Sequence, residues 1–281
     1  MKALVTGCAG FIGSHLVERL LADKREVTVL DNFSNGSLKN LLSVKSNPLL
    51  RIEEADVSDR KKMEPFFSGV DTVYHLAALA DIVPSIQRPV EYFKSNVDGT
   101  FEVMECARRA AVGQVLYAAS SSCYGIPDKT PTSEEAEIRP QYPYALTKFL
   151  GEQIVLHCGR VYKMNVNSLR FFNVYCPRAR TNGTYGAVFK VFLPQKIHGM
   201  PFTIVGDGTQ TRDFTYVSDV VEAMVAVAES GLKNEIFNVG SCTTVSVNAI
   251  VRLLGGAGKT VHIPKRPGEP DSTFADISKI K

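Results

Sequence analysis

The chain has 281 residues, of which 44% are hydrophobic, and its formal net charge at pH 7 is +3. A chain near this length buries roughly 75% of the surface of its unfolded form, and this apolar content is enough to fill that interior. A disordered, collagen-like or disulfide-scaffold protein is thereby excluded. The charges are spread along the chain without a basic block, so neither nucleic acid nor a membrane is expected as a partner.

The cysteines and the N-terminal residues favour a cytoplasmic protein. The six cysteines stand far apart, at positions 8, 106, 123, 158, 176 and 242. They form no CxxC pair and no Cys/His cluster, so we expect buried thiols in a reducing compartment and no metal site. The first residues, MKALVTG, start no signal-peptide pattern, and the chain has no run of 18 apolar residues.

Short apolar runs alternate with helical patterns in the first part of the chain. Predicted strands cover residues 2–6, 27–30, 50–55, 71–76 and 114–119, and predicted helices cover 11–23, 59–67, 90–111 and a stretch from 143. Strands that alternate with helices indicate βαβ units and a parallel sheet. Because such crossovers are right-handed, we expect an α/β fold with a doubly wound parallel sheet of the Rossmann type.

The pattern changes near residue 172. Prolines and the glycine-rich stretch VGDGTQTRDF interrupt shorter elements, which include helices at 217–230 and 246–254 and a strand at 235–239. We therefore predict one domain over residues 1–172 and a smaller C-terminal lobe over 173–281. Segments at about 214–240 are expected to pack back on the sheet. The cleft between the two parts is the default binding site.

A glycine motif follows the first predicted strand and opens the first helix. Gly7, Gly10 and Gly13 allow a sharp turn and a close approach of the backbone to a pyrophosphate at the helix N-terminus. Asp31 ends the second strand, where a carboxylate can bind an adenosine ribose diol and would repel a 2′-phosphate. Residues 1–172 are therefore predicted to bind NAD rather than NADP. A glycine-rich turn with an exposed aspartate is the structural alternative.

Two further motifs follow that carry polar chemistry. Tyr144 and Lys148 lie one turn apart on the predicted helix from 143, where the ammonium would favour the phenolate. Tyr142 has no lysine at that spacing. Ser120 stands at the carboxyl end of a predicted strand, facing the ligand crevice of such a sheet, and could exchange a proton with a sugar oxygen. Taken alone, the Tyr144/Lys148 spacing is also typical of an ordinary surface pair, and the serines are also typical of a strand-to-loop turn.

These motifs together resemble the extended short-chain dehydrogenases/reductases. The order of the three glycines, Asp31, HLAA at 75–78, SSSCYG at 120–125, YALTK at 144–148 and LRFFN at 169–173 is similar to that of the NAD-dependent epimerase/dehydratase family. Within it, the chain looks most like the nucleotide-sugar 4-epimerases of the UDP-glucose and UDP-N-acetylglucosamine type.

The resemblance implies a role for each matching residue. The catalytic residues would be Tyr144, Lys148 and Ser120. NAD would be held by Gly7, Gly10, Phe11, Ile12, Gly13, Asp31, Asn32, Asp56, Val57, Leu76, Ala77, Ala78, Ala80, Asn96, Tyr144, Lys148 and Phe171. The substrate would contact Ser121, Ser122, Asn173, Ala187, Val188, Arg212, Arg266, Glu269 and Thr273.

The expected reaction is epimerisation of a UDP-linked sugar at C4 through a transient 4-keto intermediate. Relatives that act as 4,6-dehydratases carry an Asp-Glu pair where this chain has Ser121 and Ser122, and uronate decarboxylases usually carry Glu at the second position. Both alternatives therefore lose weight, because hydroxyls are poor acids and bases near neutral pH. A binding protein that only senses NAD would not need Ser120, Tyr144 and Lys148 together.

Two finer expectations concern the assembly and the sugar. Family members form homodimers through two helices, and apolar residues beyond one stripe occur here at 101, 103 and 104 and at 146, 149, 150 and 154. Those helices could instead bury both faces within one subunit. In the resembling epimerases the position of Thr273 lies beside the C2 substituent of the sugar. A small residue there predicts room for an N-acetyl group as well as a hydroxyl, unless Thr273 makes no substrate contact.

Overall fold

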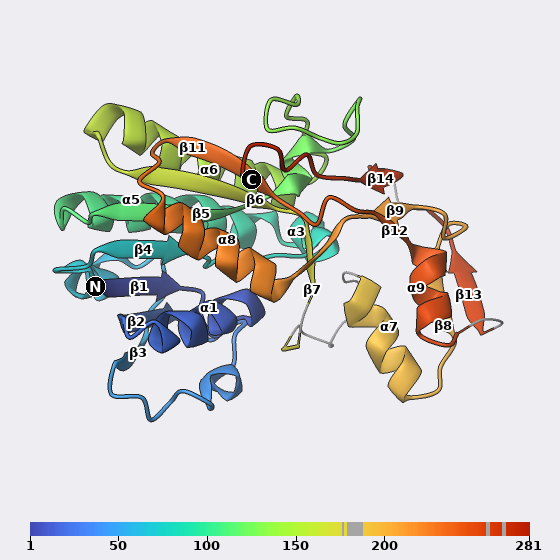
Figure 1. Cartoon of the computed structure of the whole chain (residues 1–281), viewed down its shortest axis with the longest axis horizontal. Coiled ribbons are helices and arrows are strands. Elements are labelled where there is room, and N and C mark those ends of the chain that lie inside the picture. Colours follow the sequence, from blue (N-terminus) through green and yellow to red (C-terminus); the bar gives the residue numbers. More distant parts are fainter. Residues whose placement is uncertain (176, 179–187, 257–258, 266–267) are drawn as a thin grey trace.

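The fold was taken from a computed structural model, which describes residues 1–175, 177–178, 188–256, 259–265 and 268–281. Its centre is a seven-stranded parallel sheet in the order β11-β6-β5-β4-β1-β2-β3 (Figure 1). The strands are β1 (Lys2–Thr6), β2 (Glu26–Asp31), β3 (Leu50–Glu54), β4 (Thr72–His75), β5 (Gln114–Ser120), β6 (Val166–Phe171) and β11 (Glu235–Val239). The predicted α/β fold class is confirmed.

Helices cover both faces of this sheet (Figure 1). On one face lie α1 (Phe11–Ala22) and α8 (Val217–Glu229), and on the other lie α5 (Gly99–Arg109) and α6 (Pro143–Tyr162). Successive strand residues enter opposite core layers, as the pleat requires. In β1, for example, Ala3 and Val5 join the first layer and Leu4 joins the second. This burial on both faces explains the continuous apolar runs in the sequence.

The edges of the helical layers contain shorter elements. These are α2 (Arg60–Met63), α3 (Ile82–Gln87) and α4 (Pro89–Phe93), with 3₁₀ turns at Leu38–Leu41, Glu64–Phe67 and Ser121–Tyr124. The single helix predicted over 90–111 is α4 and α5 joined by a π-helical turn at Lys94–Asp98. The long helix α6 begins with Pro143 at its first turn, where the missing N–H of proline costs no helical hydrogen bond.

A smaller lobe lies beyond the carboxyl ends of the sheet strands (Figure 1). It contains α7 (Val188–Ile197), α9 (Val247–Leu253), and the paired strands β8 (Phe202–Val205) and β13 (Thr260–Ile263) around a core of Phe192, Phe202, Ile204, Val247, Ile250 and Val251. Two further small sheets pair β7 (Asn173–Tyr175) with β10 (Phe214–Tyr216), and β9 (Thr211–Arg212) with β12 (Val245–Ser246) and β14 (Ser272–Thr273).

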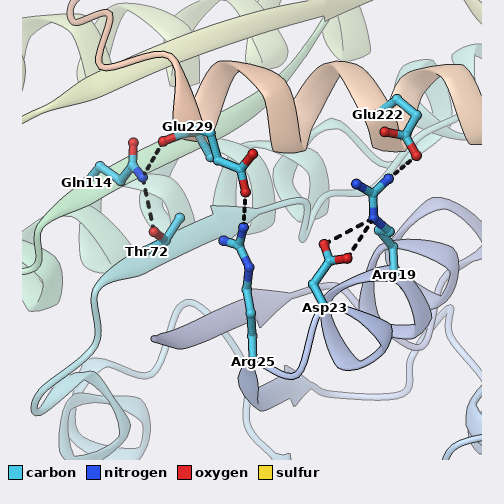
Figure 2. Close-up of polar contacts among 8 residues, drawn as sticks. Arg19, Asp23, Arg25, Thr72, Gln114, Glu222 and Glu229 are labelled. Atoms are coloured by element: carbon cyan, nitrogen blue, oxygen red, sulfur yellow. Dashed lines mark hydrogen bonds and ion pairs between the residues drawn. The ribbon is translucent and has the colours of Figure 1, made fainter.

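Polar contacts fasten α8, which comes late in the chain, to the N-terminal part of the sheet (Figure 2). Arg19 of α1 bonds Asp23 at 3.0 Å and also reaches Glu222 of α8. Arg25, before β2, pairs with Glu229 at the end of the same helix. Gln114 of β5 donates to the carbonyl oxygen of Ala228 at 2.9 Å. Together with the apolar layer beneath, these contacts hold α8 against α1 and β5.

The expectation of buried thiols holds with one exception among the described cysteines. Four of the five described cysteines are buried as expected, but Cys242 is exposed, and Cys176 lies outside the described residues. Within the described part of the chain, every helix is too short or too polar to cross a lipid bilayer.

Candidate functional site

The loop between β1 and α1 holds the glycine motif. Gly7 has a φ of +69°, and a Cβ there would lie 2.5 Å from the backbone nitrogen of Ala77. A Cβ on Gly13 would lie 2.5 Å from the Cα of Cys8. These two positions therefore require glycine so that the loop can pass close to its neighbours. At Gly10, the N-cap of α1, a Cβ would meet only the carbonyl oxygen of Gly7, at 3.1 Å.

Asp31 ties the end of β2 to this loop. Its Oδ2 accepts a hydrogen bond from the backbone N–H of Ala9 at 2.8 Å, and its Oδ1 accepts from the N–H of Phe33 at 2.8 Å. Both bonds orient the buried carboxylate along the edge of the cavity described below. The next residue, Asn32, donates through Nδ2 to Asp56 Oδ2 at 2.7 Å.

Asp56 supports Asn32 from outside the cavity, whereas Val57 lines it. Burial opposes ionisation of Asp56, but hydrogen bonds from Ser58 and Asn32 hold the pKa of its carboxyl below the usual range. Of these two predicted residues, Val57 faces the cavity, whereas Asp56 holds Asn32, which also faces it.

Asn96 braces the loop that follows β4. It is fully buried; its Oδ1 accepts from the N–H of Leu79 at 2.7 Å, and its Nδ2 donates to the Leu79 carbonyl at 3.0 Å and to Thr147 Oγ1 at 3.0 Å. The loop so held presents Leu76, Ala77, Ala78 and Ala80 to the cavity. Asn96 itself therefore positions the loop and α6 rather than lining the cavity.

Tyr144 and Ser120 come together at the carboxyl end of β5. Burial raises the pKa of Tyr144 to about 12, while a hydrogen bond with the Ser120 side chain acts in the opposite direction. Ser120 Oγ also accepts from the backbone N–H of Ser122 at 3.2 Å and from its hydroxyl at 2.9 Å. Since Ser122 donates its proton to Ser120, the chain of hydroxyls can orient Ser120 toward the phenol. Ser121 lies in the same 3₁₀ turn.

Lys148 lies one helical turn beyond Tyr144, as the spacing predicts, and is only 4% exposed. Its Nζ lies 4.3 Å from the ring centroid of Tyr117, a cation–π contact. Burial lowers the pKa of Lys148 to about 7, and the nearby Glu152 carboxylate opposes this effect. His75 remains neutral beside it, because burial and the lysine charge lower the pKa of its imidazole to about 3.

One cavity of about 240 Å³ brings most of these residues together. Its lining includes Gly7, Gly10, Phe11, Ile12, Gly13, Asp31, Asn32, Val57, Leu76, Ala77, Ala78, Ala80, Tyr144, Lys148 and Phe171. The predicted glycine loop, acidic strand end and Tyr/Lys pair therefore share one space at the carboxyl ends of β1, β2, β4 and β5.

Apart from Ser121 and Ser122, which lie beside Ser120, the predicted substrate residues follow β6 in the chain. Arg212 and Glu269 line a second cavity, of about 270 Å³. Burial lowers the pKa of Arg212, and the Glu269 carboxylate opposes this. Asn173 donates through Nδ2 to Thr273 Oγ1 at 2.9 Å, which joins two predicted contacts. Val188 opens α7 and packs against the lobe core. Ala187 and Arg266 lie outside the described residues.

Asp81 and Lys190 also line the first cavity, although sequence reasoning missed them. Asp81 Oδ1 lies 3.2 Å from Lys190 Nζ. Its position directly after Ala80, in the loop at the end of a predicted strand, was a usable signal. Lys190 gave none, because 109 residues separate the two partners and only the fold brings them together.

A comparison with known proteins decides the family. The NAD dependent epimerase/dehydratase family matches residues 3–240 of the chain. The chain belongs to this family. The predicted membership and the predicted cofactor class are thus confirmed.

Several members of this family are similar to this chain over nearly its whole length. The UDP-glucose 4-epimerase of Mycolicibacterium smegmatis is 35% identical over 288 residues, which span 100% of this chain and 89% of that protein. The UDP-N-acetylglucosamine 4-epimerase of Methanobrevibacter ruminantium, solved with UDP-N-acetylmuramic acid, has a TM-score of 0.93 at 32% identity and covers 99% and 90% of the two chains. The UDP-glucuronic acid 4-epimerase of Bacillus cereus, solved with UDP-glucuronic acid and NAD, has a TM-score of 0.92 at 32% identity and covers 100% and 91%.

The residues of this epimerase/dehydratase-family cavity fit the cofactor that the family uses. The space beside Gly10 is free of a side chain at the positive end of α1, which suits a pyrophosphate. Asp31 offers carboxylate oxygens to a ribose diol, and the strip from Leu76 to Ala80 is apolar apart from its backbone. In the described ranges, no three His, Cys, Asp or Glu side chains come together as metal ligands do.

Proposed function

We propose that the protein interconverts the C4 epimers of a UDP-linked hexose, either UDP-glucose and UDP-galactose or the N-acetylated pair. The observation that carries the proposal is that Tyr144 and Lys148 line the same cavity as the glycine loop and Asp31. Ser120, at the end of β5, forms a hydrogen bond with Tyr144 from outside that lining. The names of the similar proteins support the substrate class, since all three act on or bind UDP-sugars.

Each side chain of the site has its own role in the proposed reaction. Tyr144 takes the proton of the sugar 4-hydroxyl and later returns it, and Ser120 holds the same oxygen by a hydrogen bond. Lys148 lies one helical turn from Tyr144, and its Nζ is 4.3 Å from the Tyr117 ring centroid. When Lys148 is protonated, its positive charge favours the phenolate form of Tyr144. When bound, NAD supplies a reversible hydride acceptor for the sugar carbon. Arg212 suits the diphosphate, because guanidinium groups pair with phosphate oxygens.

The residues around Ser120 favour epimerisation over elimination or loss of carbon dioxide. A 4,6-dehydratase needs an acid and a base beside C5 and C6, yet Ser121 and Ser122 offer hydroxyls, and that of Ser122 is engaged with Ser120 at 2.9 Å. We therefore rank the dehydratase and decarboxylase reactions below the epimerase.

The test is incubation of the purified protein with UDP-glucose, UDP-N-acetylglucosamine or UDP-glucuronate, in separate reactions without added reductant, followed by proton NMR. Formation of the matching galacto epimer, without net change of NAD, is the expected result. Production of a 4-keto-6-deoxy sugar or of carbon dioxide from a uronate would contradict the epimerase and favour one of the alternatives.

We also propose that the protein is a homodimer, joined through α5 and α6. Phe101 of α5 is 51% exposed and Leu146 of α6 is 38% exposed, and apolar side chains at this level are candidates for a partner surface. Val103 and Met104, expected on the same surface, are instead fully buried within the subunit. The proposed interface therefore contains fewer residues of α5 than the sequence predicts.

Light scattering at micromolar concentration should give the mass of a dimer, and Phe101→Glu should give a monomer. Leu253→Glu is the matched control, because Leu253 is also exposed but lies on α9. A monomer mass for the unaltered protein, or dissociation by both substitutions, would defeat the proposed interface.

A further inference from the structure

An ion pair spans the catalytic cavity between the two parts of the chain. Asp81 lies in the loop between β4 and α3, and Lys190 lies on α7 of the smaller lobe. Their charged atoms are 3.2 Å apart, and the side chains are 30% and 21% exposed. Both residues line the same cavity as Tyr144 and Lys148. The pair therefore shares one cavity with the tyrosine proposed as the catalytic residue.

The backbone of Asp81 indicates that its side chain is held for this contact. Its φ is +127° and its ψ is +130°, a region that residues with a Cβ rarely adopt. Asp81 is also the N-cap residue of α3, but its side chain makes no capping hydrogen bond. The carboxylate turns away from the helix that it could cap and toward Lys190, so the ion pair replaces the ordinary local use of an aspartate here.

The carboxylate also lies close to the reacting centre. Its charge is one of the influences that, after burial, raise the pKa of Tyr144. In a hexopyranose, C4 is bonded to C5, which carries C6. A sugar whose 4-hydroxyl meets Tyr144 therefore has its C6 group near the tyrosine, and in the pose that the proposal requires this group points toward Asp81. That C6 group is a neutral hydroxymethyl in glucose and a carboxylate in glucuronate.

We propose that Asp81 determines the class of sugar: by engaging the Lys190 ammonium, it makes this charge unavailable to a C6 carboxylate and sets a preference for UDP-hexoses with a C6 hydroxymethyl over UDP-hexuronates. The inference rests on the proposed function, which it narrows. A C6 carboxylate would have to displace Asp81 from Lys190 or lie beside it, and two carboxylates at one partly desolvated position repel each other. A hydroxymethyl group can donate to Asp81 and leave the ion pair intact.

The experiment compares three variants of the NAD-loaded protein. Asp81→Asn removes the charge and keeps the shape of the side chain. Lys190→Gln removes the other charge and leaves Asp81 alone. Asp128→Asn is the matched control, since Asp128 is an exposed aspartate paired with Arg139 outside the cavity. Titration calorimetry with UDP-glucuronate and UDP-glucose gives the ratio of the two Kd values for each protein, and NMR gives the corresponding rates of epimerisation.

The unaltered protein should bind UDP-glucose more tightly than UDP-glucuronate. Asp81→Asn should shift the Kd ratio toward UDP-glucuronate by about 10- to 100-fold, the size of one hydrogen bond to a charged group, because it frees Lys190 for the carboxylate. Lys190→Gln should shift it in the other direction, and Asp128→Asn should leave it unchanged.

Two results would overturn the inference: a preference of the unaltered protein for UDP-glucuronate, or a Kd ratio that Asp81→Asn leaves in place. Neither depends on turnover. Failure of the proposed function would show differently, as the absence of any galacto epimer in the NMR spectra while the binding ratios still respond to the substitutions.

Discussion

The two parts of the site are built in different ways. The predicted cofactor part, formed by the glycine loop, Asp31 and the loop 76–81, sits on adjacent strands of one seven-stranded sheet. The predicted substrate part, formed by Asn173, Arg212 and Thr273, sits on strands of two or three residues in separate small sheets. The first is held by backbone ladders of four to six residue pairs, whereas the second combines ladders of two or three pairs with side-chain bonds such as that of Asn173 with Thr273. Substitutions in the first should therefore affect cofactor retention and stability, and those in the second should affect sugar selection.

The largest effect is expected where the two parts meet. Tyr144→Phe removes one hydroxyl and should lower kcat by about 10²- to 10⁴-fold, the usual contribution of a general acid–base group. The circular dichroism spectrum should not change, because the ring remains. Tyr142→Phe is the matched control and should retain most of the activity. Equal losses for the two variants would show that the wrong tyrosine has been assigned.

Asp31→Ala tests the cofactor part alone. Loss of the carboxylate removes the ribose acceptor and leaves the N–H groups of Ala9 and Phe33 without their bonds, so NAD should bind about 10- to 100-fold more weakly. Asp31→Asn keeps one acceptor oxygen and should lose less. The measurement is the NAD released on denaturation, together with titration of the stripped protein. Equal affinity of the unaltered protein for NADP would contradict the role of Asp31.

The same contrast explains what the sequence could predict. Gly7, Gly13 and Asp31 were predictable because strand-end loops of a parallel sheet meet at one edge, and the order of these loops along the chain is the order of the motif. Ser120 and Tyr144 were found because one follows a predicted strand and the other begins a predicted helix. All of these positions follow from local pattern and one fold rule.

The remaining features depend on contacts that local pattern does not encode. Strand β6 was not recognised, although all six of its residues are buried, because Asn167, Ser168 and Arg170 interrupt its apolar run. Its polar groups are satisfied within the fold: Arg170, for example, pairs with Glu152 of α6 at 2.6 Å. The Asp81–Lys190 pair could not be predicted for a related reason, because the two partners lie 109 residues apart in the sequence.

Thr273→Tyr tests the substrate part. Thr273 pairs with Arg212 across β14 and β9, so a larger side chain there would project beside a predicted diphosphate contact. We expect the phenol to disfavour UDP-N-acetylglucosamine relative to UDP-glucose by about 1–3 kcal/mol, the cost of overpacking, with NAD binding unchanged. Thr273→Val keeps the volume but removes the acceptor for Asn173, and so separates the lost hydrogen bond from the added bulk. An unchanged ratio of kcat/KM values in Thr273→Tyr would exclude this position as a sugar gate.

The smallest expected effect is a change of the free energy of unfolding with pH. We expect Lys148, in the cofactor part of the site, to cause it. In the folded chain burial lowers the pKa of Lys148 to about 7, whereas an unfolded lysine has a pKa near 10.5. Between these values unfolding takes up a proton, so the free energy of unfolding should increase with pH, by up to about 1.4 kcal/mol per pH unit. Denaturant titrations of the stripped protein from pH 7 to 8 measure this slope before the thiols, whose pKa is raised in the fold and lies near 9 in the unfolded chain, ionise on unfolding and offset it. Lys148→Met should flatten the slope, while Lys190→Gln, with its lysine partly exposed in the other lobe, should leave it in place. An equal slope in the unaltered protein and Lys148→Met would mean that Lys148 keeps its proton in the folded state, and that its ammonium is available to Tyr144 throughout this range.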